Sequence, residues 1–178
     1  VTGAFEQGGW MRGQAPTGTV SARLGDTALV LDASGQFFAA FDRDAGPSAV
    51  LTAVIADGRQ LTRRITVAPR AWNIEHINTA RTPGGASEAF MERRRPELDA
   101  IAAARAVSSQ TEGWRQDYIR PVTGRISGRI GTQGVYRGEP GSYHSGLDIA
   151  TGGSGAPYVA PADGVVVLAT QSDFSLEG

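Results

Sequence analysis

Turn-forming dipeptides divide residues 19–67 into short runs of β-forming residues, and no helical period spans this part of the chain. The clearest pair of runs covers residues 49–55 and 60–67, separated by Asp57-Gly58. An Asp-Gly pair suits the positive φ angles of a two-residue type I′ turn. We therefore expect a β-hairpin closed by that turn.

The second run of this hairpin alternates apolar and polar residues. Leu61, Ile65 and Val67 fall on one face, as is typical of a strand with one side toward a core and the other toward water. Similar short runs precede the hairpin. Residues 1–72 are therefore predicted to form a small antiparallel, β-sandwich-like domain.

The composition changes between residues 87 and 107 to Ala, Glu, Arg and Leu, which favour helix. Ser87 is a suitable N-cap, and Glu88 in the first turn complements the helix dipole. Pro96 is expected either to kink this helix or to begin a second one. Residues 73–117 are therefore predicted to be a helical connector.

Gly and Pro become dense from Tyr118 onward, and β-forming runs return. A second, antiparallel β-domain is expected over residues 118–178, which makes the whole chain mainly β. The apolar run at 165–170 predicts a buried strand close to the last residue, so we interpret the chain as a fragment cut inside this domain. No charged and apolar leader follows Val1, and any export signal is expected to have been removed.

Charge and composition exclude several classes of protein. The 17 basic and 18 acidic residues give a formal charge of -1, too balanced for the basic surface that binds nucleic acid. The mean hydropathy is -0.20, and no apolar stretch approaches the roughly 20 residues that cross a bilayer, so no transmembrane segment is predicted. Without Cys, a bound metal must be held by His, Asp or Glu, and the chain has two His.

One of these histidines lies in the run Tyr-His-Ser-Gly-Leu-Asp-Ile-Ala at residues 143–150. It places the imidazole of His144 and the carboxylate of Asp148 four positions apart. Both groups are good zinc ligands. The glycines around them favour a loop leading into a short strand over a helix, and the two side chains can converge if the backbone bends between them.

Three segments occur in a fixed order in the last third of the chain. They are Pro-Val-Thr-Gly-Arg-Ile-Ser at 121–127, His-Ser-Gly-Leu-Asp-Ile-Ala at 144–150, and Gly-Ala-Pro-Tyr-Val-Ala-Pro-Ala-Asp-Gly-Val-Val at 155–166. Together they resemble the start of an M23 (lysostaphin/LytM-type) peptidase domain. The members of this family are zinc metalloendopeptidases that cut peptide cross-links in bacterial peptidoglycan on an antiparallel β-sheet fold. The chain departs from them at Ile130-Gly131, where many members have an aromatic residue before the Gly.

The resemblance implies a Zn²⁺ cofactor, with His144 and Asp148 as the first two ligands of the family motif HxxxD. The family completes its site with a later His-x-His pair, in which one His binds zinc and the other helps to orient or deprotonate the attacking water. That pair is expected beyond Gly178, so no catalytic residue is assigned in this chain and the fragment is expected to be inactive. The other imidazole, His76, is expected to be an ordinary surface or interface residue.

The function implied by the resemblance is hydrolysis of peptide bonds in the bacterial cell wall by an exported enzyme of the periplasm or cell envelope. Its partners are expected to be peptidoglycan peptide stems or cross-links, and no substrate-binding residue is singled out. The alternative is a non-catalytic M23-like protein that binds cell-wall peptide or activates another peptidoglycan hydrolase. A later His-x-His pair distinguishes the enzyme from this alternative.

Overall fold

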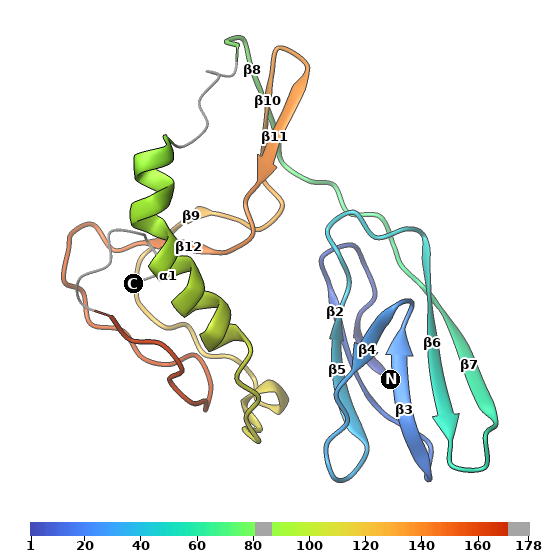
Figure 1. Ribbon diagram of the computed structural model, residues 1–178. Coiled ribbons are helices and arrows are strands. Elements are labelled where there is room, and N and C mark those ends of the chain that lie inside the picture. The colour runs from blue at the N-terminus through green and yellow to red at the C-terminus, as the bar shows by residue number, and fades with distance from the viewer. Residues whose placement is uncertain (81–86, 171–178) are drawn as a thin grey trace. The chain divides into compact units, whose positions relative to one another are not determined.

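The structure is a computed structural model that describes residues 1–80 and 87–170 (Figure 1). These residues contain twelve β-strands, one α-helix and one short 3₁₀ helix. The predicted mainly-β class is therefore confirmed.

The first 67 residues form two antiparallel sheets. The first sheet has the order β1-β2-β5 and the second the order β4-β3-β6-β7. The strands of the first sheet are β1 (Thr2–Ala4), β2 (Trp10–Gln14) and β5 (Gln36–Ala40). Those of the second are β3 (Thr19–Leu24), β4 (Thr27–Leu29), β6 (Ser48–Ile55) and β7 (Gln60–Thr66).

Side chains from both sheets meet in one buried cluster. Met11 on β2 and Phe37 on β5 are the largest fully buried side chains, and Ile65 on β7 packs in the same cluster. Phe37 and Ala39 point inward while Phe38 between them is exposed, which is the alternation expected of a strand with one covered face. Packing of one sheet on the other confirms the β-sandwich-like expectation.

The β6–β7 hairpin is confirmed, but the predicted type I′ turn is wrong. The last paired residues are Val54 and Gln60, and the Gly58 N–H donates to the Ile55 carbonyl at 2.8 Å. Only Gly58 has a positive φ, +87°, whereas a type I′ turn requires Asp57 to have one as well. The physical reason is that the Asp57 carboxylate accepts the Arg59 backbone N–H at 3.0 Å, a local bond that holds a wider loop over residues 56–58.

Five further strands lie outside the sandwich. A separate three-stranded sheet has the order β11-β10-β8, in which β10 is antiparallel to β11 and parallel to β8. Strands β9 and β12 pair in a two-stranded sheet. Strands after residue 121 are therefore confirmed. The bounds are β8 (Ile74–Ile77), β9 (Arg125–Gly128), β10 (Gln133–Tyr136), β11 (Glu139–Tyr143) and β12 (Asp148–Ala150).

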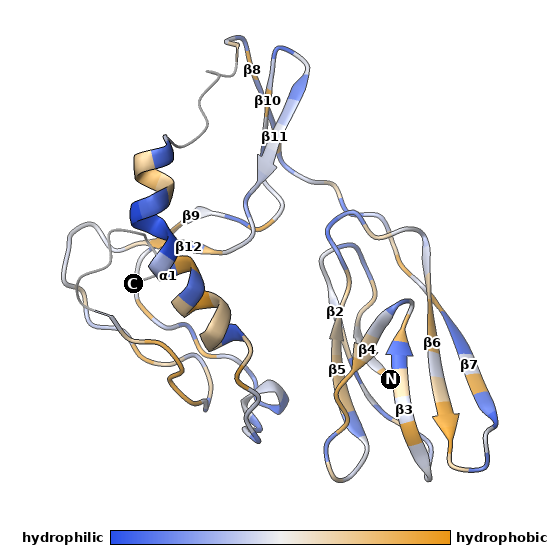
Figure 2. Ribbon diagram, viewed as in Figure 1, coloured by the Kyte–Doolittle hydropathy of each residue, from blue (hydrophilic) through white to orange (hydrophobic). Residues whose placement is uncertain are grey.

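Helix α1 spans Glu88–Arg105, and the Ser87 hydroxyl caps it by accepting the Phe90 N–H at 3.2 Å. Pro96 lies inside this one helix, so of the two alternatives at Pro96, the start of a second helix is wrong. A proline removes one N–H donor and its ring crowds the carbonyl four residues earlier, and here the residues on both sides nevertheless keep the helical conformation. Figure 2 shows polar residues gathered around the middle of α1. Across the part of the chain that the structure describes, no helix is both long and apolar enough to span a membrane.

The predicted connector is not helical throughout. It contains β8 before the helix and the 3₁₀ helix η1 (Gly113–Arg115) after it. Strand β8 has four residues and pairs with β10, more than fifty positions later, so local sequence gives little sign of it.

The buried strand predicted at residues 165–170 is wrong. These residues have no regular secondary structure, and Val166 is 82% exposed. A strand needs a neighbour for its backbone N–H and C=O groups, and no residue in 1–80 or 87–170 pairs with this run.

Backbone contacts group the chain into two compact units. The first combines Val1–Asn78 with Ile126–Asp148, and the second combines Thr79–Arg125 with the segment from Ile149 onward. In the second unit, Gln116 and Asp163 exchange two hydrogen bonds, of 2.6 and 2.9 Å. The division of the sequence at residues 72 and 117 stays a prediction.

Candidate metal centre

The two predicted zinc ligands lie on either side of a short bend in the first unit. His144 directly follows β11, and Asp148 is the first residue of β12. Gly146 lies at the bend between them. The segment is thus a loop leading into a short strand, and it returns the Asp148 side chain toward the imidazole.

The ligand atoms of the two residues face each other. His144 Nε2 lies 3.3 Å from Asp148 Oδ1, and the two side chains are 35% and 61% exposed. Two ligands bound to one tetrahedral zinc at about 2.0–2.1 Å lie about 3.3–3.4 Å apart. The separation of the pair therefore suits a shared metal ion.

His144 Nε2 has a second property that fits a ligand. The atom is shielded from solvent and has no hydrogen-bond partner among the residues that the structure describes. A shielded nitrogen that forms no hydrogen bond is costly to bury, and a metal ion bound at Nε2 would satisfy it. The pair thus fits zinc by both spacing and donor chemistry.

Gly128, the last residue of β9, packs directly against the ligand pair. A Cβ atom at this position would lie 2.4 Å from Asp148 Oδ2 and 3.1 Å from His144 Nε2. At the first distance the Asp148 carboxylate would have to shift. A side chain at residue 128 would therefore displace this carboxylate from the position it has beside His144.

Backbone hydrogen bonds hold His144 in place from two neighbouring residues. The Gly131 N–H donates to the His144 carbonyl, and the His144 N–H donates to the Thr132 carbonyl, each at 2.8 Å. The imidazole is thus carried on a backbone that is fixed on both sides of the residue.

A cavity of about 300 Å³ borders Gly128. Its lining includes groups of both charges, Arg129 and Glu75, together with the indole of Trp72. Neither His144 nor Asp148 lines it. Gly128 is therefore the residue that borders both the cavity and the His144–Asp148 pair.

The remaining histidine is not brought to the pair. His76 lies on β8, is exposed, and stands opposite Val135 in the register with β10. Among residues 1–80 and 87–170, no three His, Cys, Asp or Glu side chains are grouped to hold a metal ion. The described part of the chain thus brings together two candidate ligands, and a catalytic zinc normally has three.

Sequence reasoning singled out the two candidate ligands but missed the residues that support them. The motif at 121–127 ends one residue before Gly128, and a glycine in that position could have suggested a close approach of the backbone. Gly131 and Thr132 act through backbone groups, which every residue type except proline provides, so their role cannot be predicted from residue type.

Comparison of the sequence with models of protein families and with curated proteins found no match. Membership of the M23 family therefore stays a prediction that rests on the three sequence motifs.

Proposed function

We propose that this chain belongs to a zinc metalloendopeptidase that hydrolyses peptide bonds in bacterial peptidoglycan, with His144 and Asp148 as two of its metal ligands. The observation that carries the proposal is the 3.3 Å approach of His144 Nε2 to Asp148 Oδ1 at the predicted motif. A buried Nε2 without a hydrogen-bond partner adds support.

The residues of this chain bind and shape the site. His144 supplies a neutral nitrogen and Asp148 an anionic oxygen, while Gly128 leaves room beside both. When bound, zinc supplies a Lewis acid that lowers the pKa of a coordinated water to about 7 and polarises a carbonyl. The proton of the attacking water needs a further group, for which the family's His-x-His pair is the proposed source.

The substrate class follows from the family likeness, and the cavity beside Gly128 is compatible with it. Arg129 and Glu75 in the cavity lining could meet carboxylate and ammonium groups, both of which peptide stems carry. A cell-wall substrate places the protein in the periplasm or cell envelope as part of the same proposal.

The test is cleavage of purified peptidoglycan by the whole natural protein loaded with zinc. We expect release of new amino groups by the wild type, loss of this activity in H144A and D148A, and full activity in the control H76A. Cleavage by H144A at the wild-type rate would contradict the proposal.

A second candidate is a non-catalytic protein that binds cell-wall peptide or activates another hydrolase. It fits the same observation, since the described residues bring two candidate ligands together and a binding protein needs no complete catalytic site. Wild-type protein that binds zinc and peptidoglycan peptide at His144 and Asp148 but releases no amino groups would support this candidate.

A further inference from the structure

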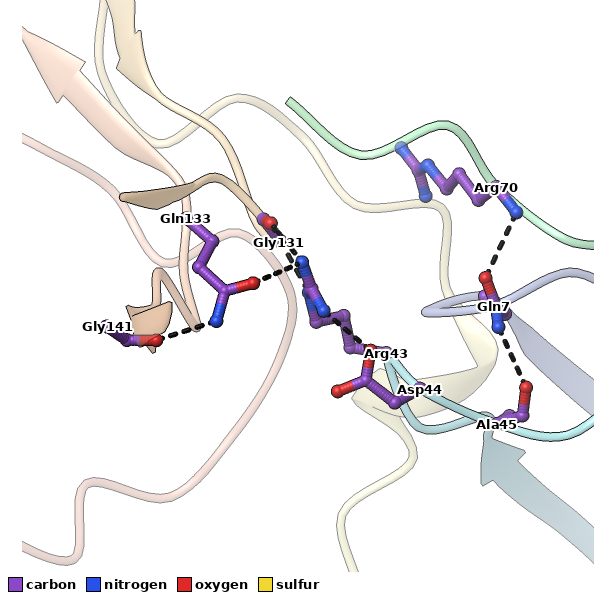
Figure 3. A network of polar contacts seen from close by, with 8 residues as sticks. All are labelled: Gln7, Arg43, Asp44, Ala45, Arg70, Gly131, Gln133 and Gly141. Atoms are coloured by element: carbon purple, nitrogen blue, oxygen red, sulfur yellow. Dashed lines mark hydrogen bonds and ion pairs between the residues drawn. The ribbon is translucent and has the colours of Figure 1, made fainter. Parts of the chain in front are cut away.

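Arg43 follows β5 in the sandwich, and its side chain is only 10% exposed. Figure 3 shows its guanidinium directed toward the segment between β9 and β10. Its Nε and Nη2 donate to the Gly131 carbonyl at 3.3 and 3.2 Å, and Nη2 also donates to Gln133 Oε1 at 3.1 Å. Gln133 in turn donates to the Gly141 carbonyl at 2.6 Å. One side chain thus connects the sandwich to β10 and β11.

The charge and the faces of this guanidinium also have partners. Nη1 pairs with Asp44 at 2.6 Å. The Arg43 guanidinium carbon lies 5.3 Å from the ring centre of Trp72 and 5.1 Å from that of Tyr143, both within the range of cation–π attraction. A nearly buried arginine with so many partners is held in one position.

Two of these partners are adjacent to the candidate metal ligand. Tyr143 directly precedes His144 in the chain. Gly131, whose carbonyl accepts from Arg43, donates its own N–H to the His144 carbonyl at 2.8 Å. Arg43 therefore fixes the backbone on which the imidazole is carried, without contacting the imidazole itself.

We propose that Arg43 is a positioning residue for His144, in an inference that rests on the proposed function for the role of His144 as a metal ligand. The residue holds the Gly131 peptide and the Tyr143 ring, and these hold the ligand at its distance from Asp148. The sandwich thereby takes part in forming the metal centre.

Arginine suits this role better than lysine. A planar guanidinium donates from several fixed directions at once, and its faces stack on aromatic rings. A lysine ammonium keeps the charge near Asp44 but cannot reach Gly131 and Gln133 with the same fork. A lysine at position 43 should therefore preserve only part of the positioning effect of Arg43.

The experiment compares the wild-type chain with R43M, R43K and the control R64M. Methionine keeps much of the apolar stem of arginine and removes every donor. Arg64 is an exposed arginine of the same sandwich, on β7, that donates to Ser48. Two readouts are taken: hydrogen exchange of the Gly131 and His144 amides, and the zinc concentration at which the His144 ring signals move in NMR spectra.

We expect R43M to accelerate exchange at both amides and to weaken zinc binding roughly tenfold, the lower end of the effect of residues behind metal ligands. R43K should lie between R43M and the wild type, and R64M should match the wild type. The β6 and β7 amides should keep their protection in R43M, which separates positioning from general destabilisation. If R43M fails to fold, the same readouts on R43K decide.

Equal amide exchange and equal zinc affinity in wild type, R43M and R43K would overturn the role of Arg43 while leaving the proposed function in place. A wild-type chain whose His144 signals do not respond to zinc would overturn the proposed function, and the metal-positioning role of Arg43 with it.

Discussion

At the scale of single residues, the candidate metal centre depends on a glycine, Gly128, which has no side chain. Gly128 lies so close to His144 and Asp148 that a methyl group at this position would overlap the Asp148 carboxylate. The lack of a Cβ lets the Asp148 carboxylate keep its position beside His144.

We predict that G128A weakens zinc binding at least tenfold, because the carboxylate must move away from the shared metal position. The matched control is G46A, since a Cβ at Gly46 would meet nothing within 4 Å. Zinc affinity is measured by competition with a chromophoric chelator. Equal affinities for G128A and G46A would show that the Asp148 carboxylate is not needed where the structure has it.

The same residues show what sequence alone can predict about the site. His144 and Asp148 were predictable because both lie in one short motif, where a bend brings neighbours together. Gly128 lies sixteen positions before His144, and Arg43 lies about a hundred before it. No local pattern reports contacts over such separations.

At the scale of elements, the loop of the β6–β7 hairpin contains a titratable group. Two hydrogen bonds from Arg59, the larger effect from its backbone N–H and the smaller from its side chain, hold the pKa of Asp57 below its ordinary value of 3.8. A carboxylate with a lowered folded pKa stabilises the hairpin above pH 3.8, and this contribution is lost as the pH falls through the folded pKa.

We predict that R59M raises the pKa of Asp57 only part of the way toward 3.8. The backbone N–H of residue 59 remains, while the side-chain donor at 2.7 Å is removed. The carboxyl carbon of Asp57 is titrated by NMR in both proteins. A pKa in R59M that equals the wild-type value would exclude the side-chain contribution.

The N-terminus of α1 depends on one side chain. Ser87 Oγ accepts the Phe90 N–H, one of the donors that the first helical turn leaves without a partner. We predict that S87A destabilises the helix by about 1 kcal/mol and that S87D retains most of the stability. Hydrogen exchange of the Phe90 amide measures both variants. No change in S87A would mean that this amide is satisfied by another group.

The elements differ in how well they could be predicted. The β6–β7 hairpin and α1 carry their own signals, a turn dipeptide in one and a capped run of helix formers in the other. Strands β1 and β8 are three and four residues long and are defined by their partners. The run at 165–170 is apolar enough to predict a strand but forms none, because no described strand lies beside it to pair with.

At the scale of the whole molecule, stability of the sandwich rests on one shared cluster. Met11 has no exposed surface and lies among residues of both sheets. We predict that M11A lowers the free energy of unfolding by about 2–5 kcal/mol, because it removes buried methylene groups and leaves a cavity. In the control V20A, at an exposed position, the loss should be below about 1 kcal/mol. Urea unfolding measures both, and similar losses would contradict the placement of the core.

The central claim is that His144 and Asp148 bind one zinc ion, and the chain's two histidines allow a direct measurement. Zinc is titrated into the 178-residue chain while the imidazole ring signals of His144 and His76 are followed by NMR. The account predicts a saturable shift of the His144 signals, weakened at least tenfold in D148A, with the His76 signals unmoved. Signals of His144 that stay in place, or that respond to zinc equally in D148A, would contradict it.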